Sequence, residues 1–452
     1  MKTFLKIIAG LVVLGVVALL AFILVPVQRT APTEQLAADW APQPGQGEYV
    51  MRAGDCAACH TAPGGEPMAG GRAIASPMGT IWATNITPDA ETGIGGWSLD
   101  DFRAALVDGV APDGTHLYPA MPYENYRFMS EEDIRALYDY LMNEVAPVRN
   151  EVAETELSFP FNLRFGIRAW NWVALRGEAG FHPEASDALQ ARGQYLVEGP
   201  GHCAACHSPR NAVMAQDGVH AGDAGFLAGG VVGDWGAPAL HGPASAVKDW
   251  SVAALAGYLA SGRNVHSAAN GEMGLVVAES LQHLSDADNI AMAAFLKGLD
   301  GAVGEVPQEL AAAPSGHAMP PEPADAAGRE TARMLTEAQP DMPLGARLYL
   351  DNCSGCHFVT GKGAPEIFPE LQGNTLVTSA QTAPLISVIL HGASLPSTAR
   401  RPLHLAMQGY ADRLGDDEIA ALSSFLREAW GNDAGPVSAG DVAAVRAAAP
   451  AH

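Results

Sequence analysis

Three copies of the motif CxxCH account for every cysteine in this 452-residue chain. They are Cys56-Ala57-Ala58-Cys59-His60, Cys203-Ala204-Ala205-Cys206-His207 and Cys353-Ser354-Gly355-Cys356-His357. Their first cysteines lie 147 and 150 residues apart. A near-constant period of this kind indicates an internal repeat. No cysteine remains for a disulfide bond or a free catalytic thiol, so the chain must build three related units, each around one motif.

The motif is typical of covalent c-type haem attachment, in which two thiols add to the haem vinyl groups and the adjacent histidine ligates the iron. A zinc site would need further Cys or His ligands at matching spacing. A thioredoxin-like CxxC would need a βαβ context. The sequence therefore predicts three haem c groups. Their attachment residues would be Cys56, Cys59, Cys203, Cys206, Cys353 and Cys356, and their axial iron ligands His60, His207 and His357.

The second axial ligand decides between electron transfer and haem chemistry, because a distal Met raises the potential and closes the iron, whereas an open site admits small molecules. Each repeat has a methionine eight to twelve residues before its last helix, and we predict these three as distal ligands: Met121, Met273 and Met407. A lone Met is usually core filler. The rival residues are Met68, Met78 and Met129 in the first repeat, Met214 and Met292 in the second, and His391 and His404 in the third.

The repeats share more than the motif. A segment with Gly and Tyr precedes each CxxCH, as in Gly47-Glu48-Tyr49, Gly193-Gln194-Tyr195 and Gly345 to Tyr349. A capped amphipathic helix is expected to close each repeat, beginning at Ser130, Ser285 and Gly415. Carboxylates in the first turn satisfy free N–H groups and the helix dipole. We place the repeats at residues 46–150, 189–301 and 343–432.

The N-terminus has the features of a membrane anchor. Lys2 and Lys6 precede an uncharged apolar run of 21 residues, 7–27, enough to cross a hydrocarbon core of roughly 30 Å as a helix. A secretory signal usually has a shorter apolar region, roughly 7–15 residues, and no small-x-small cleavage site precedes Gln28. The sequence favours a retained anchor at 1–27 and a tether at 28–45 over a cleaved signal. Either way the remainder is exported to the periplasm.

Three other stretches lie outside the repeats. The connector 151–188 interleaves the aromatic residues Phe159, Phe161, Phe165, Trp170, Trp172 and Phe181 with Arg164, Arg168 and Arg176. It is either a membrane-interface or partner-docking segment, or packing between the first two repeats with the arginines pairing haem propionates or acidic side chains. The stretch 302–342 is rich in Ala, Pro and Glu and indicates a linker. The tail 433–452 is small and polar, and we expect a frayed end.

The net charge of −24 excludes nucleic acid as a partner, because phosphate binding needs clustered Lys and Arg. An acidic surface also repels anionic lipid headgroups. It either complements a basic partner surface or is simply a soluble acidic exterior.

Beyond the haem motifs, several segments carry a family resemblance. They are Ala83-Thr84-Asn85-Ile86-Thr87-Pro88, Tyr118-Pro119-Ala120-Met121-Pro122-Tyr123, Pro209-Arg210-Asn211-Ala212, Trp235-Gly236-Ala237-Pro238-Ala239-Leu240, Phe368 to Asn374 and Trp430-Gly431-Asn432. With these, the chain resembles the three-haem cytochrome c subunit of membrane-bound dehydrogenases that oxidise alcohols, gluconate, sorbitol, fructose or aldehydes. One departure is Met407-Gln408-Gly409-Tyr410, where the family usually has Met-Pro-Gly/Ala-Phe.

The resemblance implies a mainly α fold, with an N-terminal transmembrane helix followed by three cytochrome c-like domains in tandem. It implies a non-catalytic electron-transfer subunit in the inner membrane with its haem domains in the periplasm. Electrons would enter from a substrate-oxidising dehydrogenase and leave to ubiquinone or a terminal oxidase, and the hard chemistry would belong to the partner's cofactor. Two alternatives stay open: a free-standing membrane-anchored electron shuttle, and a haem peroxidase-like enzyme with one open iron.

Overall fold

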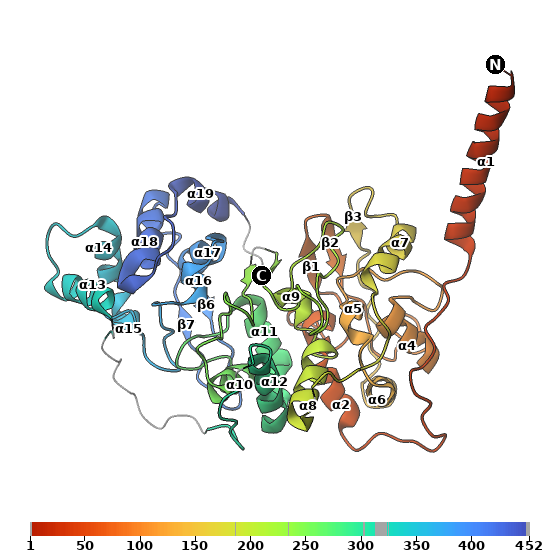
Figure 1. Ribbon diagram of the computed structural model, residues 1–452, viewed down its shortest axis with the longest axis horizontal. Helices are drawn as coiled ribbons and strands as arrows, with labels where there is room; N and C mark the ends of the chain where they lie inside the picture. The colour runs from red at the N-terminus through yellow and green to blue at the C-terminus, as the bar shows by residue number, and fades with distance from the viewer. Residues whose placement is uncertain are drawn as a thin grey trace.

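The chain folds into an elongated body from which one helix projects (Figure 1). In this computed structural model the described residues are 2–185, 187–233, 235–301, 303–311, 323 and 325–448. The projecting helix is α1 (Lys2–Leu24). Its stretch Lys6–Ile23 is long and apolar enough to cross a membrane by length and composition. The body is mainly helical, which confirms the predicted fold class at that level.

The first repeat contains five helices and a small sheet. The elements are α2 (Gln46–Ala53), α3 (Cys56–His60), β1 (Ala73–Ser76), β2 (Gly79–Trp82), α4 (Leu99–Asp108), α5 (Tyr123–Tyr126) and α6 (Glu131–Asn143). A third strand, β3 (Glu156–Leu157), comes from the connector and pairs antiparallel with β2. The strand order is therefore β1-β2-β3, with Ala73 opposite Trp82.

The remaining elements lie around the second and third CxxCH motifs. After α7 (Phe165–Ala174) the second repeat has α8 (Ala188–Glu198), α9 (Ala204–His207), β4 (Gly230–Val232), β5 (Trp235–Ala237), α10 (Val252–Ser261), α11 (Gly271–Glu279), η1 (Leu281–His283) and α12 (Asp286–Gly298). The last part has α13 (Ala326–Glu337), α14 (Leu344–Asn352), α15 (Ser354–His357), α16 (Thr375–Thr378), α17 (Ala383–His391), β6 (Ala393–Ser394), β7 (Ala406–Met407), α18 (Asp416–Glu428), η2 (Ala429–Gly431) and α19 (Ala439–Ala447). β4 pairs with β5 and β6 with β7.

The predicted starts of the three closing helices are confirmed. The Ser130 side chain accepts a hydrogen bond from the Asp133 N–H at the start of α6, and Ser285 does the same for the Asp288 N–H at the start of α12. Gly415 has no side chain, so at α18 the cap is reversed: its N–H donates to Glu418 Oε2 at 2.9 Å. Each cap satisfies an N–H group that the helix itself leaves free.

A glycine in each repeat lets the helix before CxxCH cross the closing helix at backbone contact. A Cβ on Gly47 would lie 2.3 Å from the Ala136 carbonyl oxygen, one on Gly193 2.0 Å from that of Ala291, and one on Gly345 2.2 Å from that of Ala421. α2 therefore packs on α6, α8 on α12 and α14 on α18. This crossing explains why each repeat carries the Gly-containing segment.

Buried apolar side chains gather in three clusters within the described part of the chain. One lies around Met51 and Ile134, one around Val197 and Leu255, and one around Trp430. Each cluster surrounds one pair of crossing helices, so each CxxCH motif is attached to its own core.

The first two repeats are joined by a reciprocal exchange of tyrosines. Tyr49 Oη donates to Asp288 Oδ2 at 2.6 Å, and Tyr195 Oη donates to Asp133 Oδ2 at 2.5 Å. Each tyrosine belongs to the helix before CxxCH in its repeat, and each aspartate lies in the first turn of the other repeat's closing helix. Within the second repeat, Arg192 donates two hydrogen bonds to the same Asp288, at 2.9 and 2.8 Å, and so holds the acceptor of Tyr49 in place. The two repeats therefore face each other with like surfaces.

The second and third repeats meet through different contacts. Arg263 Nη2 donates to the carbonyl oxygens of Arg401 and Leu403, each at 3.0 Å. The Glu366 N–H donates to the Asn264 carbonyl at 3.2 Å. The Tyr349 hydroxyl, which corresponds to Tyr49 and Tyr195, instead donates within its own repeat to the Phe358 carbonyl. The third repeat therefore takes no part in a tyrosine exchange like the one between the first two.

The tail 433–452 is folded over residues 439–447, so the expectation of a frayed end is wrong there. Ser438 caps α19 by accepting from the Asp441 N–H, and Val442 is fully buried. Arg446 Nε donates to Asp416 Oδ1 at 2.8 Å, which ties α19 to the start of α18. Tertiary contacts rather than the helix's own small residues hold this end in place. Residues 449–452 lie outside the described residues.

The predicted linker 302–342 also contains folded structure. Its second half forms α13, whose Leu335 is 1% exposed in the third core. Thr331 Oγ1 on this helix accepts a hydrogen bond from the Trp430 N–H at 3.1 Å. A helix with so few apolar residues is stabilised mainly by this docking. The residues 302, 312–322 and 324 of the predicted linker lie outside the described residues.

The helix crossings predict opposite effects for two glycine substitutions. Gly193→Ala should destabilise the protein by about 1–3 kcal/mol, because the new methyl group overlaps the Ala291 carbonyl and forces α8 away from α12. Gly257→Ala in α10 is the matched control. Its Cβ meets nothing within 4 Å, so the higher helix propensity of Ala should leave stability unchanged or raise it by up to about 1 kcal/mol. Thermal unfolding of both variants checks this, and equal melting temperatures would contradict it.

Candidate haem sites

Each CxxCH motif forms one short helical turn directly after the helix that crosses the closing helix. In α3 the first cysteine and the histidine are four residues apart, Cys56 and His60, and therefore lie on one face of the turn. The second and third motifs have the same spacing in and around α9 and α15. All six thiols are free of disulfide bonds. Each motif thus presents two thiols and an imidazole together, as covalent haem attachment requires.

The three motif histidines share one hydrogen-bond arrangement. His60 Nδ1 lies 2.6 Å from the Thr84 carbonyl oxygen, His207 Nδ1 2.7 Å from that of Pro238, and His357 Nδ1 3.0 Å from that of Pro369. A carbonyl oxygen can only accept, so the proton of the neutral ring is on Nδ1.

This arrangement prepares each imidazole for a metal. Burial lowers the pKa of all three rings, so they are neutral at pH 7 and Nε2 keeps a free lone pair. Metal-binding histidines in proteins typically donate their other N–H to a carbonyl or carboxylate in this way. The three histidines therefore fit the role of iron ligands.

A cavity of about 1500 Å³ connects the second and third motifs. His207, Met273, His357 and Met407 all line it. The corresponding cysteines Cys203, Cys206, Cys353 and Cys356 also border it, and most of its wall is apolar. A roomy apolar cavity with thiols, imidazoles and thioethers in its wall matches the chemistry of a haem, which is a large apolar ring with an iron centre. The residues present fit the group.

The segment just before the first motif reaches the same cavity. Asp55, the residue before Cys56, lines the cavity, and α11, which carries Met273, packs against α3. Cys56 and Met121 both pack against the hydrophobic core of the first repeat. Met121 lies between Tyr118 and α5, in a turn where its N–H donates to the Tyr118 carbonyl.

The rival ligands have varied surroundings. Met68 and Met129 are buried in the first core, and Met78 lies in the turn between β1 and β2. Met214 and Met292 also line the cavity, Met214 with half of its surface exposed. Among the described residues that line the cavity, neither His391 nor His404 is found. The structure therefore places Met407 and His357 in the wall of the same cavity as His207, Met273, Met214 and Met292.

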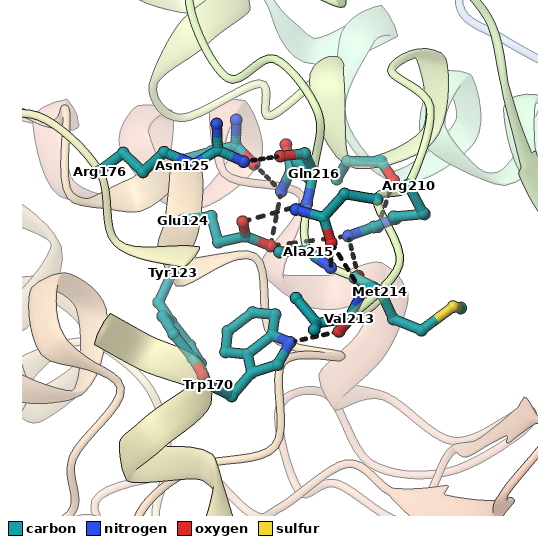
Figure 2. Close-up of polar contacts among 12 residues, drawn as sticks. Tyr123, Glu124, Asn125, Trp170, Arg176, Arg210, Val213, Met214, Ala215 and Gln216 are labelled. Atoms are coloured by element: carbon teal, nitrogen blue, oxygen red, sulfur yellow. Dashed lines mark hydrogen bonds and ion pairs between the residues drawn. The ribbon is translucent and has the colours of Figure 1, made fainter. Parts of the chain in front are cut away.

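A polar network joins the loop after the second motif to the helix after Met121 (Figure 2). Arg210 Nη2 donates to the Ala205 carbonyl inside the second motif at 2.6 Å, and Arg210 Nη1 lies 3.6 Å from Glu124 Oε1 on α5. The Gln216 N–H donates to Glu124 Oε2 at 3.2 Å, and Gln216 Nε2 donates to Asn125 Oδ1 at 2.8 Å. The first and second candidate sites are therefore fastened to each other.

Glu124 is the charged centre of this network and is 2% exposed. Burial raises its pKa to about 6, against the opposing attraction of Arg210 and the hydrogen bonds from Gln216. Around pH 6 this carboxyl is thus poised between its two protonation states in the folded protein.

The carbonyl groups of Thr84, Pro238 and Pro369 are the site residues that sequence reasoning missed. A main-chain carbonyl has no side-chain pattern, and the three lie 24, 31 and 12 residues after their histidines. The available signal was that all three fall in segments that carry the family resemblance.

Comparison with known proteins agrees with this geometry. Residues 45–144 and 343–430 match the family model for cytochrome c. The cytochrome c subunit of alcohol dehydrogenase (quinone) from Gluconobacter oxydans (strain 621H) is 40% identical over 406 residues, covering 89% of this chain and 81% of the relative. The gluconate 2-dehydrogenase cytochrome c subunit of Pantoea cypripedii is 39% identical, covering 89% of each. The fructose dehydrogenase cytochrome subunit of Gluconobacter japonicus is 37% identical, covering 95% of this chain and 88% of the relative.

The motif turns, their oriented histidines and the family match together define a c-type cytochrome. Since its relatives align over most of both chains, the protein belongs to the family of cytochrome c subunits of alcohol, gluconate and fructose dehydrogenases. Covalent haem c and electron transfer follow from that membership.

The buried carboxyl of Glu124 predicts a pH-dependent difference between the protein and Glu124→Gln. The folded state holds a proton that the unfolded state has lost above pH 4.5, so this contribution to stability is complete below pH 4.5 and is lost as pH rises through about 6. From pH 4 to pH 8 the variant should gain about 2 kcal/mol relative to the parent. Denaturant unfolding at several pH values measures this. Glu144→Gln, at an exposed position, controls for loss of charge, and a pH-independent difference for Glu124→Gln would contradict the assignment.

Met407 is the predicted distal ligand of the third repeat, so replacing its thioether should change the midpoint potential of one haem. Met407→His should lower the midpoint potential of one haem by about 0.1 V or more, because an imidazole favours the oxidised iron more than a thioether does. Potentiometric titration followed by absorbance measures this. His404→Ala, at an exposed position outside the cavity, should leave every potential unchanged. A shift in His404→Ala with none in Met407→His would reverse the ligand assignment.

Proposed function

We propose that the protein is a periplasmic electron-transfer subunit with three covalently bound haem c groups, one in each of three tandem cytochrome c-like domains. It would take electrons from a partner dehydrogenase that oxidises an alcohol, aldehyde or sugar and pass them to ubiquinone or a terminal oxidase. The observation that carries the proposal is the threefold recurrence of one arrangement, in which each CxxCH histidine gives its Nδ1–H to a carbonyl.

The proposed haem-binding residues follow the motifs. Cys56 and Cys59, Cys203 and Cys206, and Cys353 and Cys356 would hold the three groups covalently. His60, His207 and His357 would ligate the iron through Nε2, and Met121, Met273 and Met407 would ligate it through their thioether sulfurs. When bound, haem c supplies reversible one-electron chemistry at its iron. The apolar wall of the shared cavity would lower the polarity around the second and third groups, and thioether ligation would raise their potential.

The arrangement of the sites supports relay along the chain. The second and third motifs share one cavity, α11 packs on α3 of the first motif, and the Glu124 network holds the first and second sites together. No residue of the chain needs to make or break a substrate bond for this role.

Location and partner rest on separate observations. The apolar α1 supports an anchor in the inner membrane with the body in the periplasm. The names of the relatives, which are cytochrome subunits of alcohol, gluconate and fructose dehydrogenases, support a dehydrogenase partner. The net charge of −24 suits a partner whose docking face is basic.

The test is purification of the tagged protein from membranes in mild detergent. A large subunit should copurify in stoichiometric amount, and the haem spectrum should become reduced when that subunit's alcohol, aldehyde or sugar substrate is added. An untagged strain controls for non-specific capture.

Protein that purifies alone from membranes with intact dehydrogenase complexes, and that no substrate reduces, would instead favour a free-standing anchored shuttle. A high-spin haem that reacts with peroxide would favour the peroxidase-like alternative.

A further inference from the structure

An exposed apolar surface lies beside the end of α1. It is formed by the connector and the outer face of α7, and we call it the interface patch: Phe159, Phe161, Leu163, Phe165, Trp172 and Val173. Phe159 is 78% exposed and Trp172 70%. Side chains of this size are seldom left in water in a cluster, and such patches mark interaction sites.

The opposite face of α7 packs against the first two repeats. The two interpretations of the connector, packing and docking, therefore apply to different faces of this helix. Ile167, Asn171 and Ala174 are buried at helical spacing, and Asn171 Oδ1 accepts from the Tyr123 hydroxyl at 2.9 Å. Trp170 Nε1 donates to the Val213 carbonyl at 2.8 Å (Figure 2). Packing between the first two repeats therefore uses the inner face of α7, including Trp170. Trp172 and its apolar neighbours on the outer face take no part in that packing.

The end of α1 is fastened to this outer face. Arg168 Nη1 donates to the carbonyl oxygens of Phe22 and Val25 at 2.7 and 2.6 Å, groups that a helix C-terminus leaves unpaired. The Phe22 ring meets the Trp172 ring edge to face, with centroids 5.2 Å apart. Figure 1 shows α7 beside the end of α1 that joins the body. Trp172, and with it the outer face of α7, is thus held at the level where α1 ends.

The length of α1 sets that level relative to a bilayer. The 18-residue stretch Lys6–Ile23, apolar after Lys6, spans about 27 Å as a helix, close to the roughly 30 Å of a hydrocarbon core. Phe22 and Trp172 would then stand at the boundary between acyl chains and headgroups, where aromatic residues are enriched in membrane proteins. Arg164 and Arg168 beside them place positive charge at the phosphate level of an otherwise acidic protein.

We propose that the interface patch inserts into the headgroup–acyl boundary of the bilayer that α1 crosses, so that the body rests on the membrane instead of hanging from a flexible tether. This inference rests on the retained anchor of the proposed function. The occupant is lipid: the patch is continuous with the apolar helix through Phe22, and its exposed members are apolar, so insertion rather than attraction to anionic lipid drives the contact.

The test is lipid photo-crosslinking of the full-length haem-loaded protein in phosphatidylcholine vesicles that contain a diazirine-bearing phosphatidylcholine. The diazirine is placed near the glycerol backbone, and labelled sites are mapped by tryptic peptide mass. Peptides 150–164 and 169–176, which carry Phe159, Phe161 and Trp172, should be labelled along with α1. Peptide 401–413 is the control, because it carries Leu403, an equally exposed apolar residue (73%) far along the chain from the patch.

Substitutions make the expectation quantitative. Phe159→Ser with Phe161→Ser should reduce labelling of peptide 150–164 several-fold while α1 labelling and haem content stay unchanged. Leu403→Ser should alter none of these. The reduction should be the same in low and high salt, because burial of apolar surface is not screened by ions.

The outcomes separate the inference from the anchor on which it rests. Labelled α1 with unlabelled patch peptides would overturn the inference and leave the anchor intact. Patch peptides that a protein–protein crosslinker joins to a copurified subunit in the native complex, while the lipid probe leaves them unlabelled, would also overturn it in favour of a protein interface. If the mass of the mature protein shows that α1 has been removed, labelled patch peptides would still support lipid contact, and unlabelled ones would defeat both proposals.

Discussion

The hydrogen bond from a CxxCH histidine to a main-chain carbonyl is the interaction on which the rest of the molecule depends. It fixes the ring orientation and leaves Nε2 free at His60, His207 and His357. The motif cannot provide it alone, because the carbonyl comes from a loop 12 to 31 residues further on. That loop must be held against the motif turn, and the glycine-mediated helix crossings and the core around each crossing supply the rigid support.

The three repeats are alike inside and different in how they associate. Tyr49 and Tyr195 exchange hydrogen bonds with the closing helices of each other's repeat, so the first two face each other with corresponding surfaces. The third instead joins the second around a shared cavity, and its Tyr349 turns inward. Electron relay needs cofactors at fixed separations, and half-buried charge-assisted contacts such as these hold neighbouring sites in place. A flexible string of three independent units would lack that constraint.

Sequence reasoning was strongest where side-chain chemistry is local. The motifs, the caps at Ser130 and Ser285 and the helical class follow from short patterns. It failed where main-chain groups or distant partners determine the structure. The Pro238 and Pro369 carbonyls leave no side-chain pattern in the sequence. The helices α13 and α19 have few large apolar side chains and depend on docking for their stability. In the connector, composition could not separate Trp170, which packs inward, from Trp172, which stays exposed. The distal ligand assignments and the domain boundaries remain predictions.

The most direct test of the central claim, that each motif turn carries one haem, is the intact mass of the denatured, full-length protein. Covalent attachment survives unfolding, so the account predicts a chain mass increased by three haem groups and no thiol reactive towards an alkylating reagent. Peptide mapping should assign one group each to the Cys56, Cys203 and Cys353 motifs. A mass increased by two groups or fewer, with free thiols at any one motif in protein from a strain with full haem-attachment capacity, would contradict it.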